Sequence, residues 1–246
     1  MQQTSERAHH LQSSLIRDVA EKGMQMQDIL PLWFGEGQWP TSQTAIEAAQ
    51  NALQAGDHFY QPNNGKPRLR SALAHYMNGL YGTSKTRQNI TVTASGMQGL
   101  ALTALALIDS GDRVVCIDPV WPNLGESFKI AGGQIDLITL VARDGRWHLD
   151  MEQLLAKLTD KTKALLINSP NNPTGWVCST EEQKSILDHC RKQGIWIVAD
   201  DVYARLYQHG SLAPGFQHLA NADDLLISIN SFSKAWSMTG WRLGWI

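Results

Sequence analysis

From Asn89 onward, short apolar runs alternate with stretches of helical periodicity. This alternation is typical of parallel strands, because each has to reach its neighbour through a long connection that is usually a helix. The predicted fold class is therefore α/β, a mostly parallel central sheet with helices on both faces. The expected strands are 90–93, 113–117, 135–140, 163–167, 195–199 and 225–229, and the expected helices are 96–108, 125–131, 151–158 and 181–193.

The first part of the sequence predicts three further helices. The first is amphipathic, with Leu11, Leu15, Ile16 and Val19 at helical spacing. An extended, turn-rich stretch follows at 30–37. The second helix runs from about residue 44 to 56 and is capped by Thr41 or Ser42, and the third runs from 67 to about 82, with Pro67 in its first turn.

The last residues, 241–246, are typical of a strand that has just begun, without a stop signal. A domain rarely ends on an apolar run that needs sheet partners. We therefore expect the sequence to be the N-terminal piece of a longer protein.

Composition excludes several classes of protein. The net charge of −2 gives no electrostatic reason to expect nucleic acid or an anionic membrane as a partner. The longest apolar stretch, 100–108, is too short to span a bilayer, and residues 1–10 lack a signal core. Three scattered cysteines suggest no metal site and no disulfide framework, so we expect a cytoplasmic protein with no bound metal.

Residues suited to binding a ligand follow the predicted strands, and in such sheets ligands lie beyond the carboxyl ends of the strands. Ser95, Gly96 and Met97 form a turn at a helix start, where backbone N–H groups can cradle a phosphate. Trp121 could offer a flat face to an aromatic ring. Taken alone, each feature is better explained without a ligand, the first as an ordinary strand-helix turn and the second as core packing.

The next two strands are followed by polar groups in constrained loops. Asn172 lies in the proline- and glycine-rich loop 168–175 as a rigid amide donor. Asp200 is the first acid after a buried strand and could bind a protonated ring nitrogen, and Tyr203 could donate to a phenolate. A helix N-cap is the alternative role for Asp200 or for Asp201.

Lys234 follows the last of these strands, between small hydroxyl residues that include Ser231 and Ser233, and Arg242 comes eight positions later. A lysine forms a Schiff base only as the free amine, which burial and a nearby cation favour by lowering its pKa. Arg242 can grip a phosphate with its guanidinium. A surface lysine is the alternative, but the joint occurrence of all these groups is hard to explain by packing.

These residues, in this order, resemble the class I/II aminotransferases, which are pyridoxal-phosphate enzymes of fold type I. The resemblance covers nearly the whole sequence. It rests on Tyr60-Gln61-Pro62 with Gly65, Ser95-Gly96-Met97-Gln98, Trp121, Asn171-Asn172-Pro173-Thr174-Gly175, Asp200-Asp201-Val202-Tyr203, Ser231-Phe232-Ser233-Lys234 and Gly240-Trp241-Arg242-Leu243-Gly244.

The resemblance implies catalytic and ring-binding roles. Lys234 would hold pyridoxal 5'-phosphate as a Schiff base and then move the substrate proton. Asp200 would keep the ring nitrogen protonated, Asn172 and Tyr203 would bind the phenolic oxygen, and Trp121 would stack on the ring.

The resemblance also implies where the phosphate and the substrate bind. The phosphate would be held by Ser95, Gly96, Met97, Ser231, Ser233 and Arg242. Tyr60 would reach the phosphate of the other subunit, which implies a homodimer. Gly35 would meet the substrate together with Trp121 and Asn172.

The implied activity is transfer of an amino group between an L-amino acid and a 2-oxo acid. A C–S lyase, decarboxylase or racemase of the same fold type would keep the same core, and a truncated, non-catalytic cofactor-binding fragment is a further alternative. We expect a segment at 1–45, with a helix and the substrate-side loop, followed by a cofactor-binding large domain at 46–246 that is cut short at its C-terminal end.

Two departures from the family pattern concern the substrate. The arginine that would grip the substrate carboxylate belongs to a C-terminal small domain beyond residue 246, so we expect the fragment to turn over poorly. Gly37 and Trp39 replace proline and phenylalanine, which alters the lip of the substrate site.

Two other families share single motifs with this sequence, but neither has its complete set of motifs here. A β-lactamase reading of Ser231 and Lys234 lacks its companion motifs. A dinucleotide-binding reading of Gly35 and Gly37 has Pro40 where the third glycine is needed.

Overall fold

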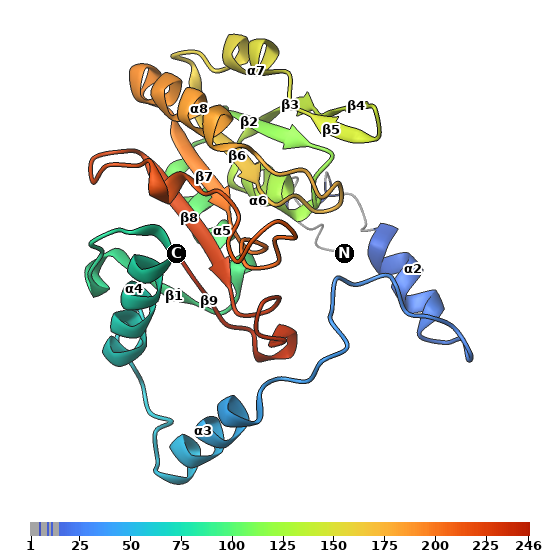
Figure 1. Ribbon diagram of the computed structural model, residues 1–246, viewed down its shortest axis with the longest axis vertical. Helices are drawn as coiled ribbons and strands as arrows, with labels where there is room; N and C mark the ends of the chain where they lie inside the picture. Colours follow the sequence, from blue (N-terminus) through green and yellow to red (C-terminus); the bar gives the residue numbers. More distant parts are fainter. Residues whose placement is uncertain (1–4, 6–8, 10, 12–14) are drawn as a thin grey trace.

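A mostly parallel seven-stranded sheet forms the centre of the protein in the computed structural model, which describes residues 5, 9, 11 and 15–246. The strand order is β1-β9-β8-β7-β6-β2-β3, and only β9 runs antiparallel to its neighbours (Figure 1). The predicted fold class is therefore confirmed. The strands are β1 (Val92–Thr93), β2 (Arg113–Asp118), β3 (Gln134–Thr139), β6 (Thr162–Asn168), β7 (Trp196–Asp200), β8 (Leu226–Ser231) and β9 (Gly244–Trp245).

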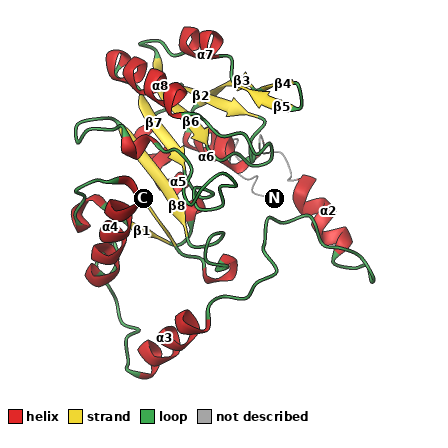
Figure 2. Cartoon of the chain, in the orientation of Figure 1, coloured by secondary structure: helices red, strands yellow, loops and turns green. Residues whose placement is uncertain are grey.

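Helices cover both faces of the sheet (Figure 2). Along β2, Val115 and Ile117 face one core cluster, whereas Val114 and Cys116 face another. Because successive side chains of a strand point to opposite faces, this division explains the unbroken apolar run of β2. The first cluster includes residues of α7 (Met151–Lys157) and α8 (Thr180–Gln193), and the second includes residues of α5 (Gly96–Leu107) and α6 (Asn123–Ala131).

A third core cluster lies at the β1 edge of the sheet. Leu73, Met77 and Tyr81 of α4 (Pro67–Tyr81) pack there with Ile90 and Trp245. Trp245 belongs to β9, so the apolar run at 241–246 does find sheet partners within the chain. β9 inserts between β8 and β1, a position that the sequence pattern did not predict.

The N-terminal segment extends away from the sheet in Figure 1. Its helices are α2 (Leu15–Gly23) and α3 (Gln43–Gln54). The expected first helix also included Leu11, which is not helical, and the neighbouring residues 12–14 lie outside the described residues. The expected domain boundary at residue 45 falls inside α3, and the division into 1–45 and 46–246 stays a prediction.

The expected cap at the start of α3 is wrong in its chemistry. Ser42 occupies the N-cap position without a side-chain hydrogen bond. Thr41 instead donates its hydroxyl to the carbonyl of Ser237, at 2.5 Å, and accepts the indole N–H of Trp241 at 3.1 Å. A long-range contact has therefore replaced the local cap, and it attaches the N-terminal segment to the loop that carries Lys234.

The prediction also missed a hairpin of β4 (Val141–Arg143) and β5 (Arg146–His148), which forms a separate two-stranded sheet. Both strands are exposed, so their sequences lack the apolar runs that mark the central strands. In the part of the chain that the structure describes, no helix has the length and apolarity needed to cross a membrane.

Candidate active site

The site forms where the carboxyl ends of neighbouring strands meet. Asn168 ends β6, Asp200 ends β7 and Ser231 ends β8. Asn168 pairs directly with Asp200 in the parallel ladder. A ligand-binding site was predicted from the sequence at this edge of the sheet.

Lys234 lies in the loop after β8, and its amine donates a hydrogen bond to the carbonyl of Gly35 at 2.8 Å. The ring of Tyr203 lies 6.0 Å from the amine, measured to the ring centroid. Burial lowers the pKa of Lys234, Glu36 opposes that shift, and Arg242 lowers the pKa further. The environment therefore favours the free amine that the sequence argument requires.

Asn172 and Tyr203 are hydrogen-bonded to each other beside this lysine. The amide of Asn172 donates to the phenolic oxygen of Tyr203 at 3.2 Å. Asn168 holds the pair in place, because its side-chain oxygen accepts the backbone N–H of Asn172 at 2.7 Å and its amide donates to the carbonyl of Asp200 at 3.0 Å. Asn168 was missed as a site residue, although its position at the end of a buried strand was the signal that identified Asp200.

Asp200 is a buried carboxylate, 7% exposed. It accepts the backbone N–H of Val202 at 3.2 Å in a turn, and no helix follows it, so the alternative role as a helix cap is wrong. Burial raises the pKa of Asp200 to about 6, while the Val202 N–H and Lys234 oppose the shift. Among the residues that the structure describes, none with a cationic side chain donates a hydrogen bond to this carboxylate.

The helix start predicted to hold a phosphate lies against the end of β8, the strand that pairs with β7. Ser95 has a φ of 113°, and α5 begins directly after it, so the N–H groups of Gly96 and Met97 stand at the helix start. A Cβ added to Gly96 would lie 3.5 Å from the Cβ of Ser231, which places the two segments side by side. The Ser231 hydroxyl donates to that of Ser233 at 2.9 Å, while the Ser95 hydroxyl caps α5 by accepting the N–H of Gln98.

Of the remaining candidates, Trp121 and Arg242 lie near the residues described above, whereas Tyr60 lies apart from them. The backbone N–H of Trp121 donates to the carbonyl of Asn172 at 2.8 Å, so the two residues that were expected to flank the ring are joined. Arg242 is exposed and donates to the carbonyl of Thr239 at 2.6 Å, but it is near enough to Lys234 to lower its pKa. Tyr60 is fully exposed, and the structure does not bring it to the other site residues.

The fold and the site define a class: an α/β protein that presents a lysine, a buried carboxylate and an anion cradle at one edge of a parallel sheet. The family model for "Aminotransferase class I and II" matches residues 31–246. The chain belongs to the class I and II aminotransferases.

Named relatives support this assignment. The chain is 34% identical over 98% of its length to an aspartate aminotransferase of Pyrococcus horikoshii, and 32% identical over its full length to an aspartate/prephenate aminotransferase of Thermus thermophilus. The solved structure of the Thermus thermophilus aspartate aminotransferase with maleate superposes with a TM-score of 0.91, at 31% identity over all of this chain. The chain spans 61% and 64% of the two curated relatives and 64% of the solved structure.

Proposed function

We propose that the chain provides the cofactor site of a pyridoxal-phosphate-dependent aminotransferase, which transfers an amino group between an L-amino acid and a 2-oxo acid. One observation carries the proposal. The half-buried amine of Lys234 lies beside the Asn172–Tyr203 pair, at the sheet edge where the buried Asp200 accepts no hydrogen bond from a cationic side chain of the described part of the chain.

The donor set fits pyridoxal phosphate group by group. The helix start at Gly96, with Ser231 and Ser233 beside it, suits the phosphate. The phenolic oxygen suits the Asn172–Tyr203 pair, and the ring nitrogen, when protonated, suits Asp200. When bound, the cofactor supplies the electron sink for the chemistry at the substrate α-carbon.

Lys234 acts first as a nucleophile and then as the general acid and base that moves the α-proton. Its lowered pKa serves attack and proton abstraction, because both need the neutral amine, and the proton that the amine then holds is the one it later donates. The Gly35 carbonyl orients the amine through their hydrogen bond. Asp200, ionised beside the ring nitrogen, would hold a proton on that atom and so strengthen the electron sink.

Further roles extend to residues at the rim of the site. Trp121 would stack on the ring, Arg242 would turn to the phosphate, and Gly35 would line the substrate side. The full exposure of Tyr60 suits a residue that reaches the site of a second copy, so we include a homodimer in the proposal. A cytoplasmic location and the large domain at 46–246 belong to the same proposal.

The printed names of the relatives make aspartate the first amino donor to assay. The chain would be mixed with pyridoxal phosphate, nitrogen-labelled aspartate and 2-oxoglutarate, and labelled glutamate would be followed by mass spectrometry. We expect slow labelling that stops in the variant Lys234→Ala. Release of ammonia or carbon dioxide without labelled glutamate would favour a lyase or a decarboxylase and overturn the transfer.

A further inference from the structure

A second polar cluster lies across the seam between β7 and β8, next to the end of β7 that carries Asp200. It consists of Asp201, Ser228, Gln217 and Asn230. Asp201 is 6% exposed, Gln217 4% and Asn230 7%. None of these four residues has a role in the proposed reaction.

The number of donors and acceptors on Ser228 shows which group donates in each hydrogen bond of this cluster. The Ser228 oxygen accepts the amide of Gln217 at 2.9 Å and the amide of Asn230 at 3.0 Å. Because a hydroxyl has two lone pairs and one proton, Ser228 has to give its proton to the Asp201 carboxylate, with which it is hydrogen-bonded. Asp201 is therefore an acceptor, and Gln217 also donates to it.

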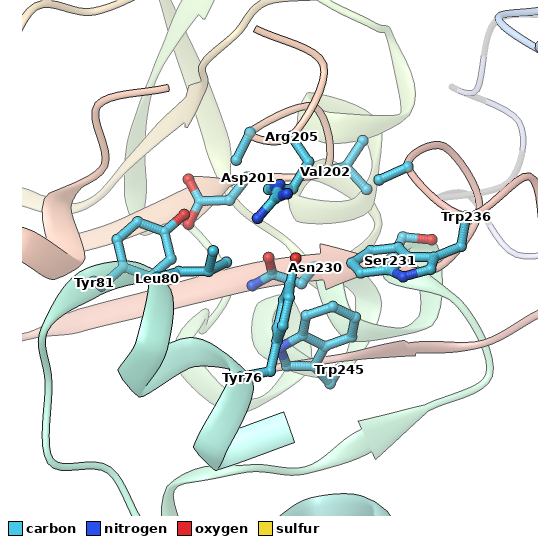
Figure 3. A pocket seen from close by; sticks show the side chains of 12 residues that line it. Tyr76, Leu80, Tyr81, Asp201, Val202, Arg205, Asn230, Ser231, Trp236 and Trp245 are labelled. Carbon is cyan, nitrogen blue, oxygen red and sulfur yellow. The ribbon is translucent and has the colours of Figure 1, made fainter. Parts of the chain in front are cut away.

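Figure 3 shows the surroundings of this carboxylate. Asp201 and Asn230 line a small cavity of about 10 Å³ with Tyr76 and Tyr81 of α4 and with Arg205. The other titratable groups nearby are Asp200, which precedes Asp201 in the chain, and His218, whose ring contacts Tyr81. Burial raises the pKa of Asp201 to about 7, bonds from Ser228 and Gln217 lower it, and Asp200 raises it.

Strands β7 and β8 carry residues of both this cluster and the proposed cofactor site. Asp201 comes directly after Asp200, the last residue of β7, and in β8 Ser228 and Asn230 alternate with Ile229 and Ser231. Ile229 pairs with Asp200, and its carbonyl accepts the backbone N–H of Asp201 at 2.9 Å. A slip at this seam would therefore move Asp200 relative to Ser231.

We propose that Asp201 is a positioning residue: acting through Ser228, it locks β8 to the end of β7 and so fixes Asp200 relative to Ser231 and Lys234. This inference rests on the proposed function, because the cofactor is what would detect the displacement. The lock requires an acceptor at position 201 and does not require a charge there.

The test compares cofactor affinity among four variants of the 246-residue chain. Asp201→Ala and Ser228→Ala remove the lock, and Asp201→Asn keeps an acceptor oxygen. Thr162→Ala is the control, because it removes a buried hydroxyl at the far end of β6, where Thr162 donates to the carbonyl of Lys157. Pyridoxal phosphate affinity, the pH dependence of its bound absorption and the unfolding of the free protein would be measured for each.

We expect Asp201→Ala and Ser228→Ala each to weaken cofactor binding about tenfold and to shift the pH dependence of the absorption, as loss of a buried hydrogen-bond partner would. Asp201→Asn and Thr162→Ala should stay within about twofold of the parent chain. If one lock variant does not fold, the other decides.

Two results would overturn the inference while leaving the proposed function intact: lock variants that bind like Thr162→Ala, or Asp201→Asn as weak as Asp201→Ala. A parent chain that takes up no pyridoxal phosphate would end both proposals.

Discussion

Replacing Asp200 by asparagine should stabilise the free protein while weakening its hold on the cofactor. The carboxylate is buried, and burial raises its pKa from 3.8 to about 6. Each pKa unit corresponds to about 1.4 kcal/mol, so the ionised group costs the folded state about 3 kcal/mol at neutral pH. Asparagine has the same shape and no charge, and its oxygen can still accept the Val202 N–H.

The sign of the pH dependence follows from the raised pKa. Well below pH 3.8 the carboxyl is protonated in both the folded and the unfolded state, and no penalty exists. As pH rises from about 4 to about 6 the unfolded state ionises first, so stability falls, and above that range the full penalty remains. We therefore expect Asp200→Asn to gain up to about 3 kcal/mol at pH 8 and almost nothing near pH 4.

Urea unfolding of the cofactor-free chain at these two pH values would measure the difference. Asp224→Asn is a matched control of opposite sign, because hydrogen bonds from Arg191 lower the pKa of Asp224, so its charge stabilises the fold fully above the ordinary pKa of an aspartate and loses this effect as pH falls through the lowered pKa. A loss of stability in Asp200→Asn at pH 8, or an equal gain at both pH values, would refute the reasoning.

Of two glycine substitutions, one should change the stability of the protein and the other its binding of the substrate. Gly244→Ala should destabilise the protein by more than about 2 kcal/mol in urea unfolding, because its Cβ would lie 2.6 Å from the backbone nitrogen of Gly96 and 2.7 Å from the carbonyl of Asn230; an unchanged midpoint would contradict this. Gly35→Ala should leave stability within about 0.5 kcal/mol, because its Cβ would lie 3.5 Å from the Lys234 amine, an ordinary contact. Its KM for the amino acid should rise while pyridoxal phosphate affinity stays unchanged, and weaker cofactor binding with normal KM would show that Gly35 is not on the substrate side.

The central sheet could be predicted because each buried strand leaves a continuous apolar run, as in 113–117 and 163–167, and the strands end near the expected residues. Asp200 and Lys234 became candidates because they follow predicted strands, but each had a bland alternative on its own segment, and their assignment as site residues, which rests on their occurrence together and on the family resemblance, stays a prediction. The predictions depended on local signals, and they were sound where local signals decide the structure.

Long-range pairing was the part that could not be predicted. The place of β9 between β1 and β8 depends on Trp245 packing against α4, residues that lie far apart in the sequence. Thr41 could have capped α3, but it bonds to Ser237. The Asp201 cluster was hidden for the same reason, since Gln217 and Ser228 carry no local pattern that joins them.

Attachment of the cofactor to Lys234 is the step on which the proposed function depends most. The chain would be incubated with pyridoxal phosphate, reduced with borohydride, digested and mapped by mass spectrometry, at several pH values. We predict a stable label on the peptide that contains Lys234, absent from Lys234→Ala, and half-maximal labelling at a pH below the ordinary pKa of lysine. A label on another lysine, or equal labelling of Lys234→Ala, would contradict the account.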